Sequence, residues 1–123
     1  MRDYKKEYEE RVAFIRDLLE KSGAKGIVYG NSGGKDSALV GLLCKAACDN
    51  TVGIIMPCAS KRNFGQDAED ARIAADQYGI ETRFIDLTPV REAEMRQLSS
   101  LTEVTPAAAV NIAPRLRMTT LYA

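Results

Sequence analysis

The sequence contains no histidine, and it has no surplus of charge of either sign. The missing histidine excludes Cys-His nucleophilic pairs and zinc sites built from cysteine and histidine. The 17 basic and 17 acidic residues cancel and are interspersed along predicted helices, whereas a protein that binds a polyanion usually carries a basic surplus or stripe. We therefore expect no nucleic-acid partner.

Long hydrophobic runs, internal repeats and low-complexity tracts are also missing. The longest apolar run is far shorter than the ~18 residues that span a membrane, and the charged N-terminus lacks the apolar core of a signal peptide. Hydrophobic residues nevertheless make up 46% of the 123 residues, which is enough to build the core of one domain. The sequence predicts a single cytoplasmic domain without a membrane partner.

Cysteine is sparse, and the three residues are Cys44, Cys48 and Cys58. An odd number without an export signal does not indicate a disulfide framework. Cys44 and Cys48 lie four residues apart on a predicted apolar helix, which is not the Cys-x-x-Cys spacing of a metal site. We predict buried free thiols rather than catalytic nucleophiles.

Hydrophobic periodicity predicts strands that alternate with helices. Tyr8, Val12, Ile15 and Leu19 recur at steps of four and three residues, which predicts an amphipathic packing helix that ends near Gly23. Further along the chain the pattern predicts strands at 26–29, 52–56 and 82–86, helices at 38–47, 64–78 and 89–99, and a loop at 100–106. This alternation is typical of an α/β fold built from βαβ units, with a parallel sheet, flanking helices and a ligand at the carboxyl ends of the strands.

The most informative segment joins the first predicted strand to the next helix, and it reads Gly30-Asn31-Ser32-Gly33-Gly34-Lys35-Asp36-Ser37. Gly33 and Gly34 can adopt positive φ and expose main-chain amides, and the following helix points its unpaired N–H groups into the turn. The hydroxyls of Ser32 and Ser37 add further donors, so a phosphate group fits there. The carboxylate of Asp36 would repel that phosphate unless a divalent cation stood between them, which implies magnesium.

Other interpretations of this loop are less well supported. Asp36 or Ser32 could simply cap the helix while the glycines form an ordinary turn, although a cap requires one such residue rather than Ser-Gly-Gly-x-Asp-Ser. A Walker A loop needs a glycine, four residues and then Gly-Lys-Ser/Thr, but Asp36 follows Gly34-Lys35 and Tyr29 occupies the place of the first glycine. The dinucleotide fingerprint Gly-x-Gly-x-x-Gly does not fit these positions either.

Residues Ser32 to Ser37 match, without a gap, the Ser-Gly-Gly-x-Asp-Ser loop of the N-type ATP pyrophosphatases. The chain thus resembles enzymes that bind ATP in this loop and release pyrophosphate after adenylating a substrate. Two further segments are similar to the NAD synthetases within that superfamily, namely Ile54-Ile55-Met56-Pro57 and Asn111-Ile112-Ala113-Pro114-Arg115-Leu116-Arg117-Met118. Val110, where many relatives carry glycine, and Ala113-Pro114 depart from the family pattern.

The resemblance implies a Rossmann-like fold of the adenine nucleotide alpha hydrolase type, with about three of the family's strands present. The first strand would lie inside the sheet, with the second and third strands on one side and strands of a later segment on the other. Because ammonia-using NAD synthetases are about twice as long as 123 residues, we expect residues 1–123 to be the N-terminal part of a single ATP pyrophosphatase domain whose C-terminal half is absent. Alone, this part is expected to bind ATP weakly and to make no NAD.

The implied reaction is the ATP-dependent amidation of nicotinic acid adenine dinucleotide (deamido-NAD) to NAD with ammonia. ATP would adenylate the substrate carboxylate with release of pyrophosphate, and ammonia would then displace AMP. ATP is accordingly a co-substrate, Mg²⁺ is the cofactor, and deamido-NAD and ammonia are the other small-molecule partners. The resemblance also implies a homodimer.

The resemblance places ATP at the loop and at the end of the second strand. Ser32, Gly33, Gly34 and Ser37 would hold the β- and γ-phosphates, Asp36 would ligate Mg²⁺, and Gly30 and Asn31 would shape the approach. Lys35 occupies the variable position of the motif, so it could assist the phosphates or face solvent. Met56 could lie against the adenine or serve as an ordinary core residue.

Two arginines near the end of the sequence belong to the third matching segment. Arg115 matches the family's arginine that contacts deamido-NAD, a role suited to a guanidinium that forks onto a carboxylate or phosphate. Arg117 lies about 200° further around a helix. One of the pair could therefore bind ligand while the other makes a structural ion pair.

Two other functions share the loop motif. A tRNA-modifying adenylating enzyme of the thiolase or lysidine synthetase type would favour a basic surface and paired cysteines, which the charge balance and the spacing of Cys44 and Cys48 argue against. A nucleotide-binding module without ligase activity would bind AMP as well as ATP and convert neither.

Overall fold

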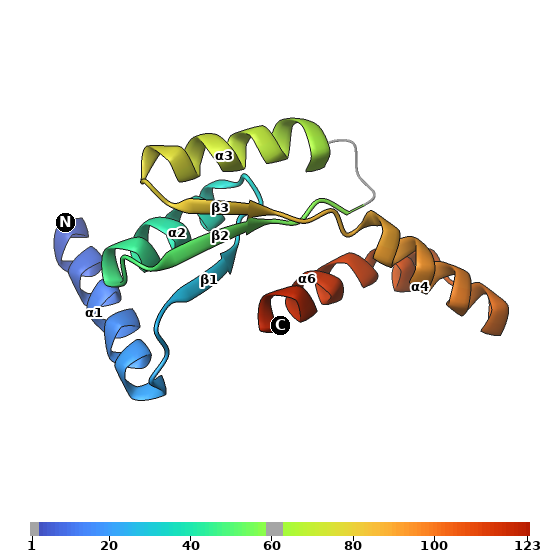
Figure 1. The fold of residues 1–123 in the computed structure, drawn as a ribbon, viewed down its shortest axis with the longest axis horizontal. Coiled ribbons are helices and arrows are strands. Elements are labelled where there is room, and N and C mark those ends of the chain that lie inside the picture. The colour runs from blue at the N-terminus through green and yellow to red at the C-terminus, as the bar shows by residue number, and fades with distance from the viewer. Residues whose placement is uncertain (1–2, 59–62) are drawn as a thin grey trace.

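The computed structural model describes residues 3–58 and 63–123, and it contains one three-stranded parallel sheet with flanking helices (Figure 1). The elements are, in chain order, α1 (Tyr4–Ser22), β1 (Ile27–Gly30), α2 (Lys35–Ala47), β2 (Thr51–Ile55), the π-helical turn η1 (Asn63–Asp67), α3 (Ala68–Gln77), β3 (Glu81–Phe84), α4 (Thr88–Leu101), α5 (Pro106–Val110) and α6 (Ile112–Tyr122). The predicted α/β fold is confirmed.

The strands lie in the order β1-β2-β3, so β2 and β3 are on the same side of β1, as predicted. Tyr29 of β1 pairs with Gly53 of β2, and Gly53 in turn pairs with Thr82 of β3. All three strands run parallel, which places their carboxyl ends at one edge of the sheet. In doubly wound folds this edge is where ligands bind.

One face of the sheet is covered by α2 and α3, and Tyr29 is the side chain that joins them to it. The ring of Tyr29 is buried with Ala75 and Ile80. A Cβ at Gly41 of α2 would overlap this tyrosine, and a Cβ at Gly53 of β2 would make a tight contact with it at 3.0 Å. These two glycines therefore let the helix and the strand approach the tyrosine closely. Burial, together with the proximity of Cys44, raises the pKa of the Tyr29 hydroxyl.

The first helix packs on α2 rather than on the sheet. Val12 and Ile15 contact Leu43 and Ala47, as expected for an amphipathic packing helix. Gly23, in the left-handed conformation with φ 70°, ends the helix at the predicted place.

Among the residues that the structure describes, the opposite face of the sheet is covered only near the carboxyl ends of the strands. Side chains alternate between faces along a strand, so Val28 points away from Tyr29, and it is 51% exposed. Near the end of β1, Leu121 of α6 lies beside Gly30, and the helix continues the packing through Leu116 onto the buried cluster of Met56, Cys58 and Leu87. Figure 1 shows α6 running back toward the sheet from the α4 region.

Element boundaries differ from the sequence prediction in one informative place. The helix expected at 64–78 begins instead with η1, and regular α-helix starts only at Ala68. A π-helical turn widens the backbone locally and commonly occurs at functional sites. The other elements agree within a few residues, and Gly79, with φ 66°, follows α3 as expected. No helix in the described part of the chain is long and apolar enough to cross a membrane.

The contact between Tyr29 and Gly41 predicts a stability effect. Gly41→Ala adds a methyl group where the Tyr29 ring already lies, and overpacking of a filled core costs about 1–3 kcal/mol. Higher helix propensity offsets about 1 kcal/mol of that loss. We expect a net decrease in the free energy of unfolding, measured by urea denaturation. Gly65→Ala is the control because a Cβ there meets nothing within 4 Å, and equal stability of the two variants would contradict the packing argument.

Candidate functional site

The loop that joins β1 to α2 is held in shape by its own polar groups. The hydroxyls of Ser32 and Ser37 lie 3.0 Å apart, the Ser32 N–H donates to Ser37 Oγ at 3.3 Å, and Ser37 Oγ donates to the Gly34 carbonyl at 3.1 Å. Gly34 is the N-cap residue of α2 and makes no side-chain capping bond. The simple cap by Ser32 or Asp36 is thus not what the loop forms, and the first amides of α2 face the turn without a capping side chain.

Gly33 requires glycine for two separate reasons. Its φ of 84° lies in the left-handed region that side chains disfavour. In addition, a Cβ at Gly33 would overlap the main-chain carbonyl of Asp67, the last residue of η1. The loop therefore packs backbone against backbone on the segment that precedes α3.

Lys35 and Asp36 stand in the first turn of α2, and both are exposed. No group of three or more His, Cys, Asp or Glu side chains suited to a metal occurs in the described part of the chain. A single carboxylate next to an anion-receptive turn nevertheless suits Mg²⁺, which commonly takes one or two protein carboxylates together with phosphate oxygens and water. The residues present therefore fit a cation that arrives with a nucleotide rather than an all-protein metal site.

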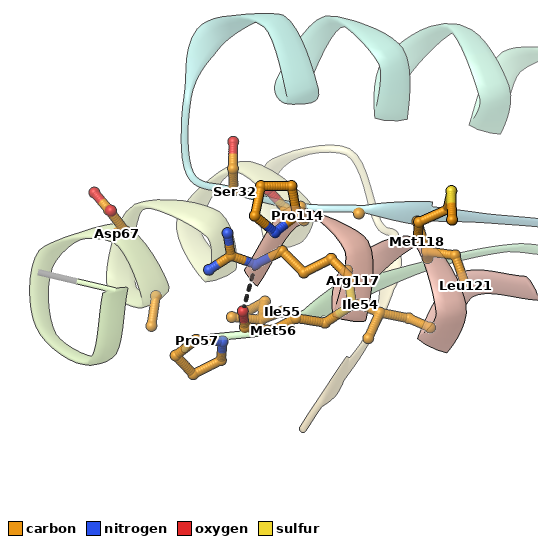
Figure 2. Close-up of a pocket in the computed structure, with 13 residues that line it drawn as sticks. Ser32, Ile54, Ile55, Met56, Pro57, Asp67, Pro114, Arg117, Met118 and Leu121 are labelled. Atoms are coloured by element: carbon orange, nitrogen blue, oxygen red, sulfur yellow. Dashed lines mark hydrogen bonds between the residues drawn. The ribbon is translucent and has the colours of Figure 1, made fainter. Parts of the chain in front are cut away.

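A cavity of about 460 Å³ opens beside the loop at the carboxyl ends of the strands (Figure 2). Four parts of the chain form its wall: the end of β1 with the loop, the end of β2, the junction of η1 and α3, and α6. Its lining residues are Gly30, Asn31, Ser32, Ile54, Ile55, Met56, Pro57, Asp67, Ala68, Pro114, Arg117, Met118 and Leu121. Its size suits a small-molecule ligand.

Of the predicted ATP-binding residues, Gly30, Asn31, Ser32 and Met56 line this cavity. The remaining five, Gly33, Gly34, Lys35, Asp36 and Ser37, belong to the adjoining turn and the start of α2. Met56 is buried, its side chain approaches Gly30, and its carbonyl accepts a hydrogen bond. The structure thus brings the loop and the end of the second strand together.

The two arginines of α6 have different surroundings. Arg115 is exposed, and its Nη1 donates to the Asn111 carbonyl within its own helix at 3.1 Å. Arg117 is half-buried and lines the cavity, where its Nε donates to the Met56 carbonyl at 2.9 Å (Figure 2). The sequence left open which arginine faces a ligand pocket, and the structure places Arg117 there.

Asp67 and Leu121 also line the cavity, and sequence analysis did not single them out. The position of Asp67 could have been inferred from topology. The connection between β2 and α3 starts at the carboxyl edge of the sheet, where the turn after β1 also lies. Leu121 has no comparable signal, because its place follows from how α6 packs back on β1.

Cys58 directly follows Pro57, which lines the cavity, but its thiol is not activated as a nucleophile. Burial raises the pKa of its thiol, and this effect outweighs the opposing influence of Arg117 and Arg91. Burial likewise raises the pKa of Cys44. Both residues are buried and Cys48 is partly exposed, so the prediction of buried free thiols is confirmed for two of the three.

The parallel sheet, its flanking helices and the cavity at the strand ends define a Rossmann-like α/β protein. The sequence model of the NAD synthase family matches residues 7–123. The chain belongs to the NAD synthase family.

Individual relatives agree with this assignment. The NH(3)-dependent NAD(+) synthetase of Finegoldia magna is 40% identical over 121 residues, which are 98% of this chain and 48% of the relative. The solved NH3-dependent NAD synthetase of Campylobacter jejuni, in complex with nitrate, is 33% identical with a TM-score of 0.84, and the match covers 98% of this chain and 51% of that one. The NMN synthetase of Francisella tularensis is 28% identical with a TM-score of 0.88, covering 99% and 50%. The chain spans about half the length of the curated relatives that it matches.

The raised thiol pKa values predict slow alkylation of the two buried cysteines. A thiol reacts as the thiolate, so a pKa above the ordinary 9.0 lowers the reactive fraction of Cys44 and Cys58 at pH 8. We expect iodoacetamide to modify Cys48 first, and the other two only after denaturation, as followed by peptide mass spectrometry. Labelling of Cys58 as fast as Cys48 in the folded protein would contradict this reasoning.

Proposed function

We propose that this chain carries part of the active site of an ammonia-dependent NAD synthetase. The observation that supports the proposal most directly is the unbroken Ser32-to-Ser37 motif at the turn between β1 and α2. The adjoining cavity is lined by residues of the second and third matching segments. The relatives from Finegoldia magna, Pyrobaculum aerophilum and Campylobacter jejuni are NH3-dependent NAD synthetases, which supports the same reaction. In this reaction ATP drives the amidation of deamido-NAD by ammonia, and AMP and pyrophosphate are released.

In the proposed site the turn holds the part of ATP that leaves. Main-chain amides of Gly33 and Gly34 and the hydroxyls of Ser32 and Ser37 would bind the β- and γ-phosphates, helped by the positive end of the α2 dipole. Asp36 would ligate Mg²⁺, which supplies positive charge to the departing pyrophosphate. Lys35 stands exposed at the first position of α2, from which it can reach solvent or a phosphate.

The remainder of the nucleotide would occupy the cavity. Ile54, Ile55 and Met56 present apolar side chains and main chain at the end of β2, a surface suited to an adenine. Arg117, fixed by its bond to the Met56 carbonyl, brings positive charge to the same cavity. The fixed donors lower the barrier by positioning and electrostatic stabilisation, so the scheme requires no general base from this chain.

Arg115 would serve the second substrate. Because it is exposed on another side of α6 from Arg117, a guanidinium there suits a carboxylate or phosphate of deamido-NAD that lies outside the cavity. The proposal also includes a cytoplasmic homodimer. Large apolar side chains exposed on α4 to α6 support it, among them Leu101 and Tyr122.

The central test is NAD formation by the natural gene product that carries these residues. With ATP, Mg²⁺, ammonia and deamido-NAD, we expect NAD, AMP and pyrophosphate to form in equal amounts, as measured by chromatography. Asp36→Asn should lower kcat by about 100-fold or more. The variant lacks the carboxylate that would ligate Mg²⁺, and the charge stabilisation that Mg²⁺ supplies in the transition state is worth several kcal/mol. The control is Asp49→Asn, which affects an exposed carboxylate paired with Lys45 at the far end of α2.

Several results would contradict the function. Unchanged turnover in Asp36→Asn would remove the metal role. Formation of NMN in place of NAD would mean the activity named for the Francisella relative. Retention on tRNA at physiological salt would favour the RNA-modifying alternative, and binding of AMP and ATP without turnover would favour a binding module.

The two arginines of α6 predict a separation of kinetic effects. Arg117→Gln should raise the KM for ATP about tenfold or more and leave the KM for deamido-NAD nearly unchanged, because a hydrogen bond to a charged group contributes about 1.5–3 kcal/mol. Arg115→Gln should show the opposite pattern. Steady-state kinetics with each substrate varied in turn gives both values, and identical patterns in the two variants would refute the assignment.

A further inference from the structure

The side chain of Asn31 is one of the few polar groups buried in the described part of the chain, and it is 4% exposed. It follows the last residue of β1, where its main-chain N–H donates to the Ile54 carbonyl at 2.9 Å and extends the β1-β2 ladder by one residue. The side-chain Nδ2 donates to the carbonyl of Ala71 in α3 at 2.9 Å. On the other side of the amide, Oδ1 accepts from the Gly33 N–H at 3.3 Å.

One amide group therefore connects α3 to the turn. The main-chain N–H of Asn31 is bonded to Ile54 of the strand, and its side-chain Nδ2 is bonded to Ala71 of the helix. These two bonds fix the position of the side-chain oxygen Oδ1. That oxygen directs an N–H of the turn, the same group that an oxyanion would require. A second contact supports the first, since Gly33 rests on the Asp67 carbonyl four residues before Ala71.

The two bonds of the Asn31 amide differ in length in a way that matters for binding. The bond to Ala71 has ordinary length, while the one from Gly33 lies beyond the usual 2.7–3.2 Å for N–H···O and is correspondingly weak. A phosphate oxygen carries charge and accepts a stronger hydrogen bond than a neutral amide oxygen does. The Gly33 N–H can therefore exchange the Asn31 oxygen for a phosphate oxygen as its hydrogen-bond acceptor at small cost. The bond from Asn31 Nδ2 to Ala71 stays in place.

Packing alone does not explain an asparagine at this place. Burying an amide costs free energy that its hydrogen bonds only offset. Leucine has the same branching and number of side-chain heavy atoms and would occupy the site without polar groups. The choice of asparagine is explained if the orientation of the Gly33 amide is the property that the side chain provides.

We propose that Asn31 is a positioning residue that holds the Gly33 amide ready for the phosphate chain of a nucleotide, through its tie to Ala71. This inference rests on the proposed function, since it takes the turn to be the phosphate site. It gives Asn31 a role that differs from direct contact with ATP. It also makes α3 part of the site, although no residue of α3 beyond Ala68 lines the cavity.

The test compares two asparagines that each tie a strand end to a carbonyl. Asn50 Nδ2 donates to the Lys25 carbonyl at 2.9 Å, the same length as the bond from Asn31, but at the opposite edge of the sheet. Asn31→Leu and Asn50→Leu should both lower Tm. Only Asn31→Leu should weaken binding of ATP and of inorganic pyrophosphate, by about tenfold in each Kd, which corresponds to about 1.4 kcal/mol. Calorimetric titration of the natural gene product well below Tm measures both.

A kinetic readout separates positioning from stability. For Asn31→Leu we expect a higher KM for ATP and an unchanged KM for ammonia, whereas a loss of folded protein lowers the apparent kcat and moves neither KM. If Asn31→Leu does not fold, Asn31→Ala removes the same two bonds without adding bulk. Failure of both variants to fold at 10 °C would make Asn31 a stability residue and overturn the proposal.

The remaining outcomes distinguish this proposal from the proposed function. Tight ATP binding by a folded Asn31→Leu variant overturns the role of Asn31 alone. Nucleotide binding that depends on Asn31 in a gene product that makes no NAD overturns the function and supports the positioning role. A wild-type protein that binds neither ATP nor pyrophosphate overturns both.

Discussion

The site depends on the close approach of two backbones, that of the turn at Gly33 and that of the segment ending at Asp67. This contact leaves no room for a side chain, and it occurs where φ is already positive. It fixes the turn against the start of α3, and the cavity begins beside it. A phosphate-binding loop needs such fixed amides, because amides that must first reorganise lose part of the binding free energy.

That approach is possible because α2 and α3 both lie close to the sheet around one tyrosine. Tyr29 packs against Gly41 and Gly53 as well as Ala75 and Ile80, so the small residues Gly41 and Ala75 set the depth at which the two helices rest. A larger residue at Gly41 or Ala75 would push its helix away from the Tyr29 ring and so disturb the contact between the turn and Asp67. The core therefore acts on the site through geometry, although Tyr29 itself does not line the cavity.

Much of the fold could be predicted from the sequence because its signals are local. The glycine that ends α1, the β-branched strands and the loop after Gly30 each follow from short segments, and βαβ alternation then gives the parallel order. The π-helical turn before Ala68 could not be predicted, because it adapts the chain to a neighbour that is distant in sequence. The orientation of Arg117 is a similar case, since helix periodicity separates it from Arg115 but cannot say which side faces the sheet.

The three segments that identify the family are widely separated along the chain and meet in one place. Arg117 and Met56 are 61 residues apart, and one hydrogen bond joins them; Leu121 lies beside Gly30. A motif that served only helix packing would have no reason to converge on the same cavity as the glycine-rich turn. Their convergence means that α6 forms part of the same wall as the turn, so a ligand there would contact the β1–α2 turn and α6 at once. Binding such a ligand would stabilise the packing of α6 on the sheet by linkage.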